Sequence, residues 1–95
     1  MYLTNSYISE KEVYFKNFGT SHVAVDEGRG LRAEKGVSLG DCQRLCDQNP
    51  ACNSFAYCDS PSHSKDCFTK NKVLTGMEPK KKNEGCTTYF RGLRA

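Results

Sequence analysis

The six cysteines can take part in more kinds of chemistry than the other residues of this sequence. A thiolate can bind a metal, attack an electrophile or exchange electrons, and two thiols can join in a disulfide. Four of the six fall in the stretch DCQRLCDQNPACNSFAYC, residues 41–58. The spacing of the whole set decides among these chemistries: Cys42, Cys46, Cys52, Cys58, Cys67 and Cys86.

A structural zinc site usually presents two pairs of ligands, with only a few residues between the members of each pair. Cys42 and Cys46 fit one such pair, but the other cysteines are too widely spaced to form a second. His22 and His63 are too far apart in the sequence to form a histidine pair. The pattern therefore does not favour a metal site, and we expect no cofactor.

A redox-active cysteine pair of the thioredoxin type has two intervening residues and opens a helix, where the helix dipole lowers the thiol pKa. Cys42 and Cys46 have three intervening residues and fall inside an expected helix. His63 lies in a Ser-rich segment and is expected to be solvated rather than catalytic. The sequence also lacks the motifs of serine hydrolases, zinc proteases and phosphate-binding loops. We therefore expect no enzymatic activity.

Disulfide formation is the third use of these cysteines. An even number of cysteines in a chain of 95 residues is typical of small proteins in oxidising compartments. A chain of this length forms one domain with a modest core, which disulfides help to stabilise. We therefore expect a disulfide-stapled domain that is secreted or belongs to a cell-surface ectodomain. Spacing alone does not choose among the possible pairings.

The composition limits the remaining classes of function. The net charge of +3 is too small to indicate nucleic-acid binding. No apolar run approaches the roughly 20 residues of a membrane-spanning helix, and the first residues lack the features of a signal peptide. Met1 is therefore expected to be either a cytosolic start or the start of an excised domain. The cysteine content favours the second interpretation, and we expect a monomer.

The clearest predicted element is a helix that begins after Ser38. Ser38 is a favourable N-cap, and Asp41 lies at the acidic position of a capping box. Leu39, Cys42 and Cys46 share one helical face, and Asn49-Pro50 ends the helix. Strands are predicted where β-branched and aromatic residues gather, and polar or Gly-containing segments are predicted as connections.

The predicted strands are residues 12–18, 22–25, 52–58, 67–76 and 86–93, of which 67–76 runs into a turn. The predicted turns and loops are 26–30, 31–36, 59–66 and 77–85. In the segment 52–58, Phe55 and Tyr57 are expected on one face of the strand, with Ala56 and Cys58 on the other. In the turn 26–30, Gly28 and Gly30 can both adopt positive φ. The fold class is therefore α+β: a small antiparallel β-sheet with one helix packed across it.

The stretch DCQRLCDQNPACNSFAY, followed by DCF at residues 66–68, resembles a PAN/apple domain. That family has a helix bearing C-x3-C, a third cysteine opening a C-x-x-F-x-Y strand, and a further cysteine before an apolar residue in a later strand. The resemblance extends over residues 12–91, with an N-terminal segment at 1–11 and a tail at 92–95. It implies the disulfides Cys42–Cys67 and Cys46–Cys52.

The sequence departs from the apple branch, which joins its first strand to its last by a third disulfide. No cysteine precedes Cys42 here. Once the two implied pairs are assigned, Cys58 and Cys86 are left, and we expect them to pair with each other. If they do not, Cys86 is free or joins a partner chain.

The resemblance implies an extracellular module that binds proteins or carbohydrates within a larger secreted or surface protein. We expect a non-catalytic module that recognises carbohydrate, including acidic glycans. The alternatives are a protein–protein interaction or adhesion module of a receptor ectodomain, and a stand-alone secreted effector. We expect the domain neither to bind nucleic acid nor to insert directly into a membrane.

The basic run Lys80-Lys81-Lys82, with Lys70 and Lys72 nearby in the sequence, is the candidate ligand site. Clustered lysines suit sulfated or carboxylated polymers because binding releases counterions. A solvated loop that keeps the domain soluble is the alternative interpretation. Most aromatic residues must build the core, but Tyr2 and Tyr7 are candidates for exposed contacts to a sugar ring or a protein partner.

Overall fold

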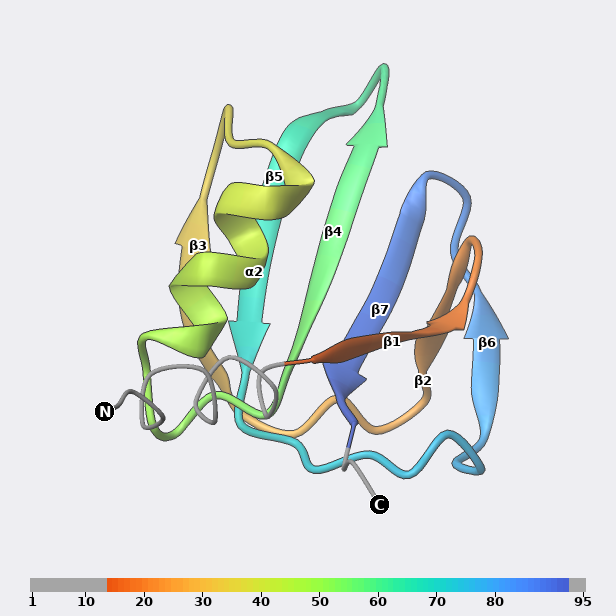
Figure 1. Ribbon diagram of the computed structural model, residues 1–95. Coiled ribbons are helices and arrows are strands. Elements are labelled where there is room, and N and C mark those ends of the chain that lie inside the picture. Colours follow the sequence, from red (N-terminus) through yellow and green to blue (C-terminus); the bar gives the residue numbers. More distant parts are fainter. Residues whose placement is uncertain (1–13, 93–95) are drawn as a thin grey trace, which may run out of the picture.

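The computed structural model describes residues 14–92, which form two antiparallel β-sheets and one helix (Figure 1). This arrangement confirms the predicted α+β class. The elements in chain order are β1 (Phe15–Gly19), β2 (His22–Ala24), β3 (Gly30–Glu34), α2 (Leu39–Asp47), β4 (Ser54–Ser60), β5 (His63–Lys70), β6 (Lys80–Lys82) and β7 (Cys86–Arg91).

The main sheet has five strands in the order β1-β7-β4-β5-β3, and β2 pairs with β6 in a second, smaller sheet. Helix α2 lies across β4 and β5 on one face of the main sheet, called here the helix face (Figure 1). The small sheet packs beside β7 and β1. Its buried residues Val23 and Ala24 contact side chains on the opposite face of the main sheet, called here the open face.

The helix begins and ends where the sequence predicts. The Ser38 hydroxyl accepts a hydrogen bond from the Asp41 amide at 3.1 Å, which satisfies a donor left unpaired at the helix start. Cys42 and Cys46 point into the core and are completely buried. The capping interaction and the buried cysteine face together fix the helix over β4 and β5.

Aromatic rings and two disulfides fill the space between the helix and the sheet. Phe55 is completely buried, stacks on Tyr89 with ring centroids 5.2 Å apart, and meets the edge of Phe15 at 5.3 Å. Tyr57 donates a hydrogen bond from its hydroxyl to the Val37 carbonyl at 2.6 Å, just before the helix. Desolvation, with smaller contributions from nearby carboxylates, raises the pKa of Tyr57. Phe55 and Tyr57 thus lie on the same face of β4, as the sequence predicts.

Two predicted boundaries in the centre of the chain are wrong. Residues 59–66, predicted as a loop, belong largely to a hairpin in which Ser60 pairs with His63 across a two-residue turn. The strand predicted to begin at residue 67 begins at His63 in β5, and the turn predicted at its end belongs to a loop at residues 71–79. Polar residues at the hairpin tip are largely exposed, so they show no alternation that would mark them as strand.

Two segments predicted as loops contain strands at sheet edges. The first, residues 31–36, contains most of β3, and the second, residues 77–85, contains β6. Both strands are short and rich in charge, and each obtains its partner from a distant segment, β5 or β2. In the turn 26–30, only Gly28 adopts positive φ, because Gly30 already opens β3.

The predictions made for the two ends of the chain concern residues that the structure does not describe. Tyr2, Tyr7 and the whole N-terminal segment 1–11 lie outside the described residues, as does the tail beyond Gly92. Within residues 14–92, no helix is long and apolar enough to cross a membrane.

Candidate binding groove on the open face of the sheet

All six cysteines are joined in disulfides: Cys42–Cys67, Cys46–Cys52 and Cys58–Cys86. The first two are the pairs that the family resemblance implies, and the third is the pair left over. The first ties α2 to β5, and the second closes the turn after the helix. The third joins directly opposed residues of β4 and β7 on the open face.

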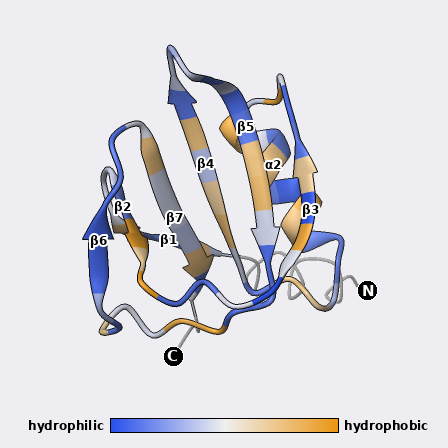
Figure 2. Ribbon diagram, turned by 180° about the vertical axis from the view of Figure 1, so that it is seen from behind, coloured by the Kyte–Doolittle hydropathy of each residue, from blue (hydrophilic) through white to orange (hydrophobic). Residues whose placement is uncertain are grey.

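The open face carries a groove of about 220 Å³ beside the small sheet. Figure 2 shows this side of the molecule from behind, with β7, β4 and β5 uncovered by the helix. Ala56 and Phe68 pair directly across β4 and β5 and lie at its base, together with the Cys58–Cys86 disulfide. Val23 of β2 forms the apolar side wall. The groove therefore has a continuous apolar floor.

Polar groups line the groove around this floor. Glu27, from the turn before β3, forms an ion pair with Lys70 of β5 at 3.3 Å. Asn83, which follows β6, and His63, which opens β5, also line the groove. The side chain of Asn83 has no hydrogen-bond partner among the interactions described for residues 14–92, whereas its backbone is anchored to Ser21 and Cys86. An apolar floor with a few convergent polar groups is the usual composition of a ligand site.

A buried carboxylate supports the hairpin end of the groove. Asp66 is almost completely buried, and its Oδ2 lies 3.1 Å from Nδ1 of His63 and 3.6 Å from Nζ of Lys35. The His63 ring also meets Phe68 edge-on, with centroids 6.4 Å apart. These contacts orient the His63 ring, while Oδ1 of Asp66 has no hydrogen-bond partner among residues 14–92.

The five candidate lysines do not form one cluster. Lys70 lines the groove in its ion pair with Glu27, and Lys72 forms a separate ion pair with Asp26 at 3.3 Å. The Gly28 amide and Lys72 together lower the pKa of Asp26, which favours its charged form in this pair. Both lysines are therefore largely neutralised by carboxylates of the turn before β3.

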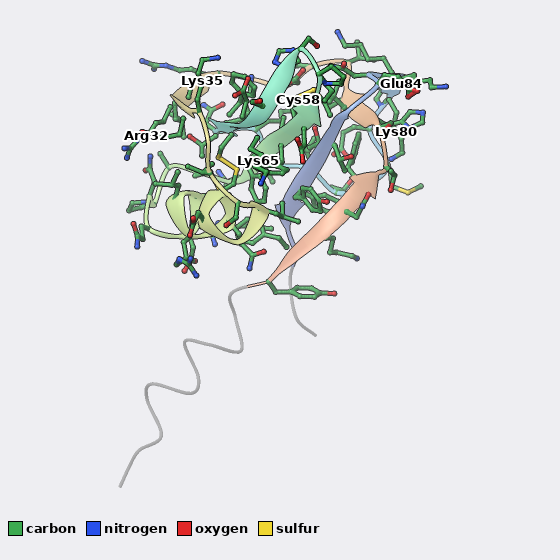
Figure 3. All side chains as sticks on the ribbon, turned by 90° about the horizontal axis from the view of Figure 1, so that it is seen from above. Arg32, Lys35, Cys58, Lys65, Lys80 and Glu84 are labelled. Atoms are coloured by element: carbon green, nitrogen blue, oxygen red, sulfur yellow. A yellow bond between two sulfur atoms is a disulfide. The ribbon has the colours of Figure 1, made fainter. Side chains whose placement is uncertain are left out.

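Lys80 is also occupied by internal contacts. Its Nζ lies 3.6 Å from the centroid of the Phe18 ring and donates a hydrogen bond to the Gly76 carbonyl at 3.0 Å. Seen from above in Figure 3, Lys80 and Glu84 lie on one side of the molecule and Lys35 on the other, with Cys58 between. The basic run is therefore accompanied by an acidic neighbour and separated from the cations beside β3.

Lys81 and Lys82 are exposed on β6 and form no ion pair within the described part of the chain. Lys81 pairs with Val23, so it shares the face of the small sheet nearest the groove, and Lys82 pairs with His22 on the other face. Because β6 pairs only with β2 in the described structure, lysines there also discourage edge-to-edge association with other chains.

Of the five lysines predicted as ligand contacts, Lys70 lines the groove, and the groove itself was not predicted. Its lining comes from β2, the following turn, β4, β5, the segment after β6, and β7. The one local signal was Ala56, a small residue between Phe55 and Tyr57, which leaves a hollow on the face away from the helix. The partners of that hollow depend on strand pairings between distant segments.

The described residues contain no group of three or more His, Cys, Asp or Glu side chains placed to bind a metal ion. The groove instead offers hydrogen-bond donors, acceptors and one half-buried aromatic ring. This arrangement can bind a small polar molecule that also has an apolar face.

Comparison with known proteins agrees with the fold and the disulfides. A family model described as the PAN domain matches residues 27–72, which span β3, α2, β4 and β5. No curated protein and no solved structure shows a significant match to the chain. The matched segment contains the helix and both disulfides of the helix face, and this segment of the chain therefore belongs to the PAN domain family.

Proposed function

We propose that this PAN domain is an extracellular carbohydrate-binding module whose ligand occupies the groove on the open face. PAN domains are typically non-catalytic modules that bind proteins or carbohydrates. The observation that carries the proposal is the half-buried ring of Phe68 at the base of a groove lined by Asn83 and the Glu27–Lys70 pair. Three disulfides favour an oxidising, extracellular location.

The chemistry of the groove matches the two sides of a pyranose ring. The face of an aromatic ring carries partial negative charge and attracts the weakly positive C–H groups on the apolar side of a sugar. The hydroxyl groups of the sugar both donate and accept hydrogen bonds. Glu27 offers acceptors, Lys70 offers donors, and the Asn83 amide offers both.

The charge of the groove favours an uncharged saccharide. Lys70 is compensated by Glu27, and His63 lies against Asp66. An anionic sugar would have to compete with Glu27 for Lys70, whereas an uncharged sugar can bond to both members of that pair. Binding in the groove is therefore expected to depend only weakly on ionic strength.

An acidic glycan at β6 is a second candidate, favoured by the exposure of Lys81 and Lys82 without an ion pair in residues 14–92. Polyanion binding would release counterions and weaken steeply as salt rises. The occupation of Lys70, Lys72 and Lys80 by internal partners leaves this surface with fewer available cations than the sequence predicts.

A glycan array that includes heparin-like polymers tests both candidates with three forms of the oxidised chain. These are the native sequence, Asn83→Ala, and the double variant Lys81→Ala/Lys82→Ala. Each variant is the matched control for the other, because both change side chains that lack a hydrogen bond or ion pair in the described structure. Thermal melts should show that both variants fold, with stability within about 0.5 kcal/mol of the native chain.

Loss of binding to uncharged glycans in Asn83→Ala, with binding retained in the double variant, is the expected result. The reverse pattern, accompanied by steep salt dependence, would move the ligand to β6 and overturn the groove. Absence of binding to any glycan by the folded native chain would overturn the carbohydrate function.

A further inference from the structure

A second hollow lies at a separate place, between the loop 71–79 and the adjoining ends of β1 and β7. Its volume is about 420 Å³, and none of its lining residues lines the groove. The apolar part of the lining is Val73, Leu74 and Phe90. The polar part is Lys16, Asn53, Thr75, Arg91 and Gly92. This hollow is called here the loop pocket.

The apolar lining includes a side chain that the fold itself does not bury. Leu74 and Phe90 are 5% and 4% exposed and belong to one cluster of the core, but the adjacent Val73 is 67% exposed. Met77, on the same loop, is 87% exposed. Val73 is therefore a large apolar side chain at the pocket that is available to contact another molecule.

The loop that presents Val73 is held in place rather than loosely attached. The Glu78 carboxylate accepts hydrogen bonds from the amides of Thr75 and Gly76 and from the Thr75 hydroxyl. At the start of the loop, the Asn53 side chain donates to the Asn71 carbonyl at 3.1 Å. The pocket is therefore formed before a partner binds, which reduces the entropic cost of binding.

The two charged residues that line the loop pocket, among residues 14–92, are both cations: Lys16 and Arg91. Lys16 is exposed and forms no ion pair with any residue in the range 14–92. Arg91 is fixed by the carbonyls of Cys46 and Cys52 and shares its charge with Asp47. No carboxylate of the described residues lines the pocket. The lining therefore combines an apolar surface with one uncompensated cation.

We propose that the loop pocket docks a segment of a partner protein in which an apolar side chain stands next to an Asp or Glu. The apolar side chain contacts Val73 and Leu74, and the neighbouring carboxylate pairs with Lys16. The positive charge of the lining selects against basic segments. This site is independent of carbohydrate binding in the groove, so the domain can hold a glycan and a protein partner together.

Selection of a random-peptide phage library on the full oxidised chain tests this proposal. Enriched peptides are synthesised, and their affinities are measured for the native chain and for three variants. Val73→Asp places a negative charge at an exposed position and should fold normally. Lys16→Glu reverses the proposed pairing charge, and Asn83→Ala is the control because it lies in the groove.

The expected consensus is an apolar residue adjacent to Asp or Glu. Affinity should fall about tenfold or more in Val73→Asp and severalfold in Lys16→Glu, and stay unchanged in Asn83→Ala. Failure to enrich any consensus would overturn the proposal. So would a consensus without an acidic residue, or a peptide whose affinity both pocket variants leave unchanged.

Discussion

The two faces of the main sheet differ in how completely they are filled over strands β4 and β5. On the helix face, Phe55 is completely buried between Phe15 and Tyr89, and two disulfides tie the surrounding segments together. On the open face, Ala56 and half-buried Phe68 lie at the base of a groove lined by ion-paired and amide side chains. Strands β4 and β5 contribute to both faces, because their successive residues alternate between them.

This contrast indicates a division of roles within one small sheet. Dense packing around Phe55 and the buried bridges supplies the stability of the fold. The open face can then retain a hollow and polar side chains that contribute little to folding but suit a ligand. Elsewhere the open face is filled, because Phe18, Leu74 and Phe90 are buried there together with Ala24 of the small sheet. The comparison can be tested by removing disulfides or side chains from each face and measuring the free energy of unfolding and ligand binding separately.

Reduction of the disulfides should have the largest effect. Each bridge is worth about 2–4 kcal/mol, mainly by restricting the unfolded chain. Three bridges are therefore comparable with the whole stability of a small domain. Circular dichroism in excess reductant should show no cooperative melt. A melt retained near the temperature of the oxidised protein would show that packing alone supports the fold.

Truncating one phenylalanine on each face should give the next largest effect and a direct comparison. Phe55→Ala removes a completely buried, stacked ring and should lower the free energy of unfolding by about 3–5 kcal/mol. Phe68→Ala makes the same change at a half-buried position beside the groove and should cost clearly less. Urea denaturation of both variants measures the difference. Equal losses would contradict the division between a stabilising and a binding face.

Acid should have the smallest effect, and it should be local to the loop 71–79. Partial desolvation raises the pKa of Glu78, but hydrogen bonds from Thr75 and Gly76, together with that of its own amide, outweigh it and lower the pKa from 4.5 to about 2. Because the folded-state pKa is depressed, the stabilisation is present above pH 4.5 and is lost as the pH falls toward about 2.

The amide chemical shifts of Thr75 and Gly76 should titrate with a midpoint near 2, whereas the amides around Phe55 should not follow this transition. Glu78→Gln is the control, because it removes the titrating group while keeping an acceptor. A titration midpoint at the ordinary glutamate value, or an equal response in the variant, would show that these hydrogen bonds do not hold the loop.

The parts of the fold that the sequence predicts are those with local signals. Ser38 marks the helix start through a contact three residues away, and the alternation of Phe55, Ala56 and Tyr57 marks β4. The helix-face disulfides follow from a resemblance carried by the spacing of the cysteines around this helix. In each case the residues that determine the structure lie within a short stretch of chain.

The edge strands and the groove could not be predicted in this way. Strand β6 consists of three lysines, which have low intrinsic preference for strands, and it forms because β2 offers backbone partners. The groove requires Val23, Phe68 and Asn83 to meet from three separate segments. The sequence interpretation also grouped Lys70 and Lys72 with the basic run, because it could not show their ion pairs with Glu27 and Asp26.

Chemical-shift mapping of the full oxidised chain tests the central claim most directly. The probe is a mixture of galactose, glucose, mannose and their N-acetylated derivatives, added at near-physiological salt. We predict that the perturbed amides cluster around Ala56, Phe68 and Asn83, and that the amides of the helix face do not move. Perturbation confined to Lys80–Lys82, or none with any sugar, would contradict the proposal that the open face is the carbohydrate-binding surface.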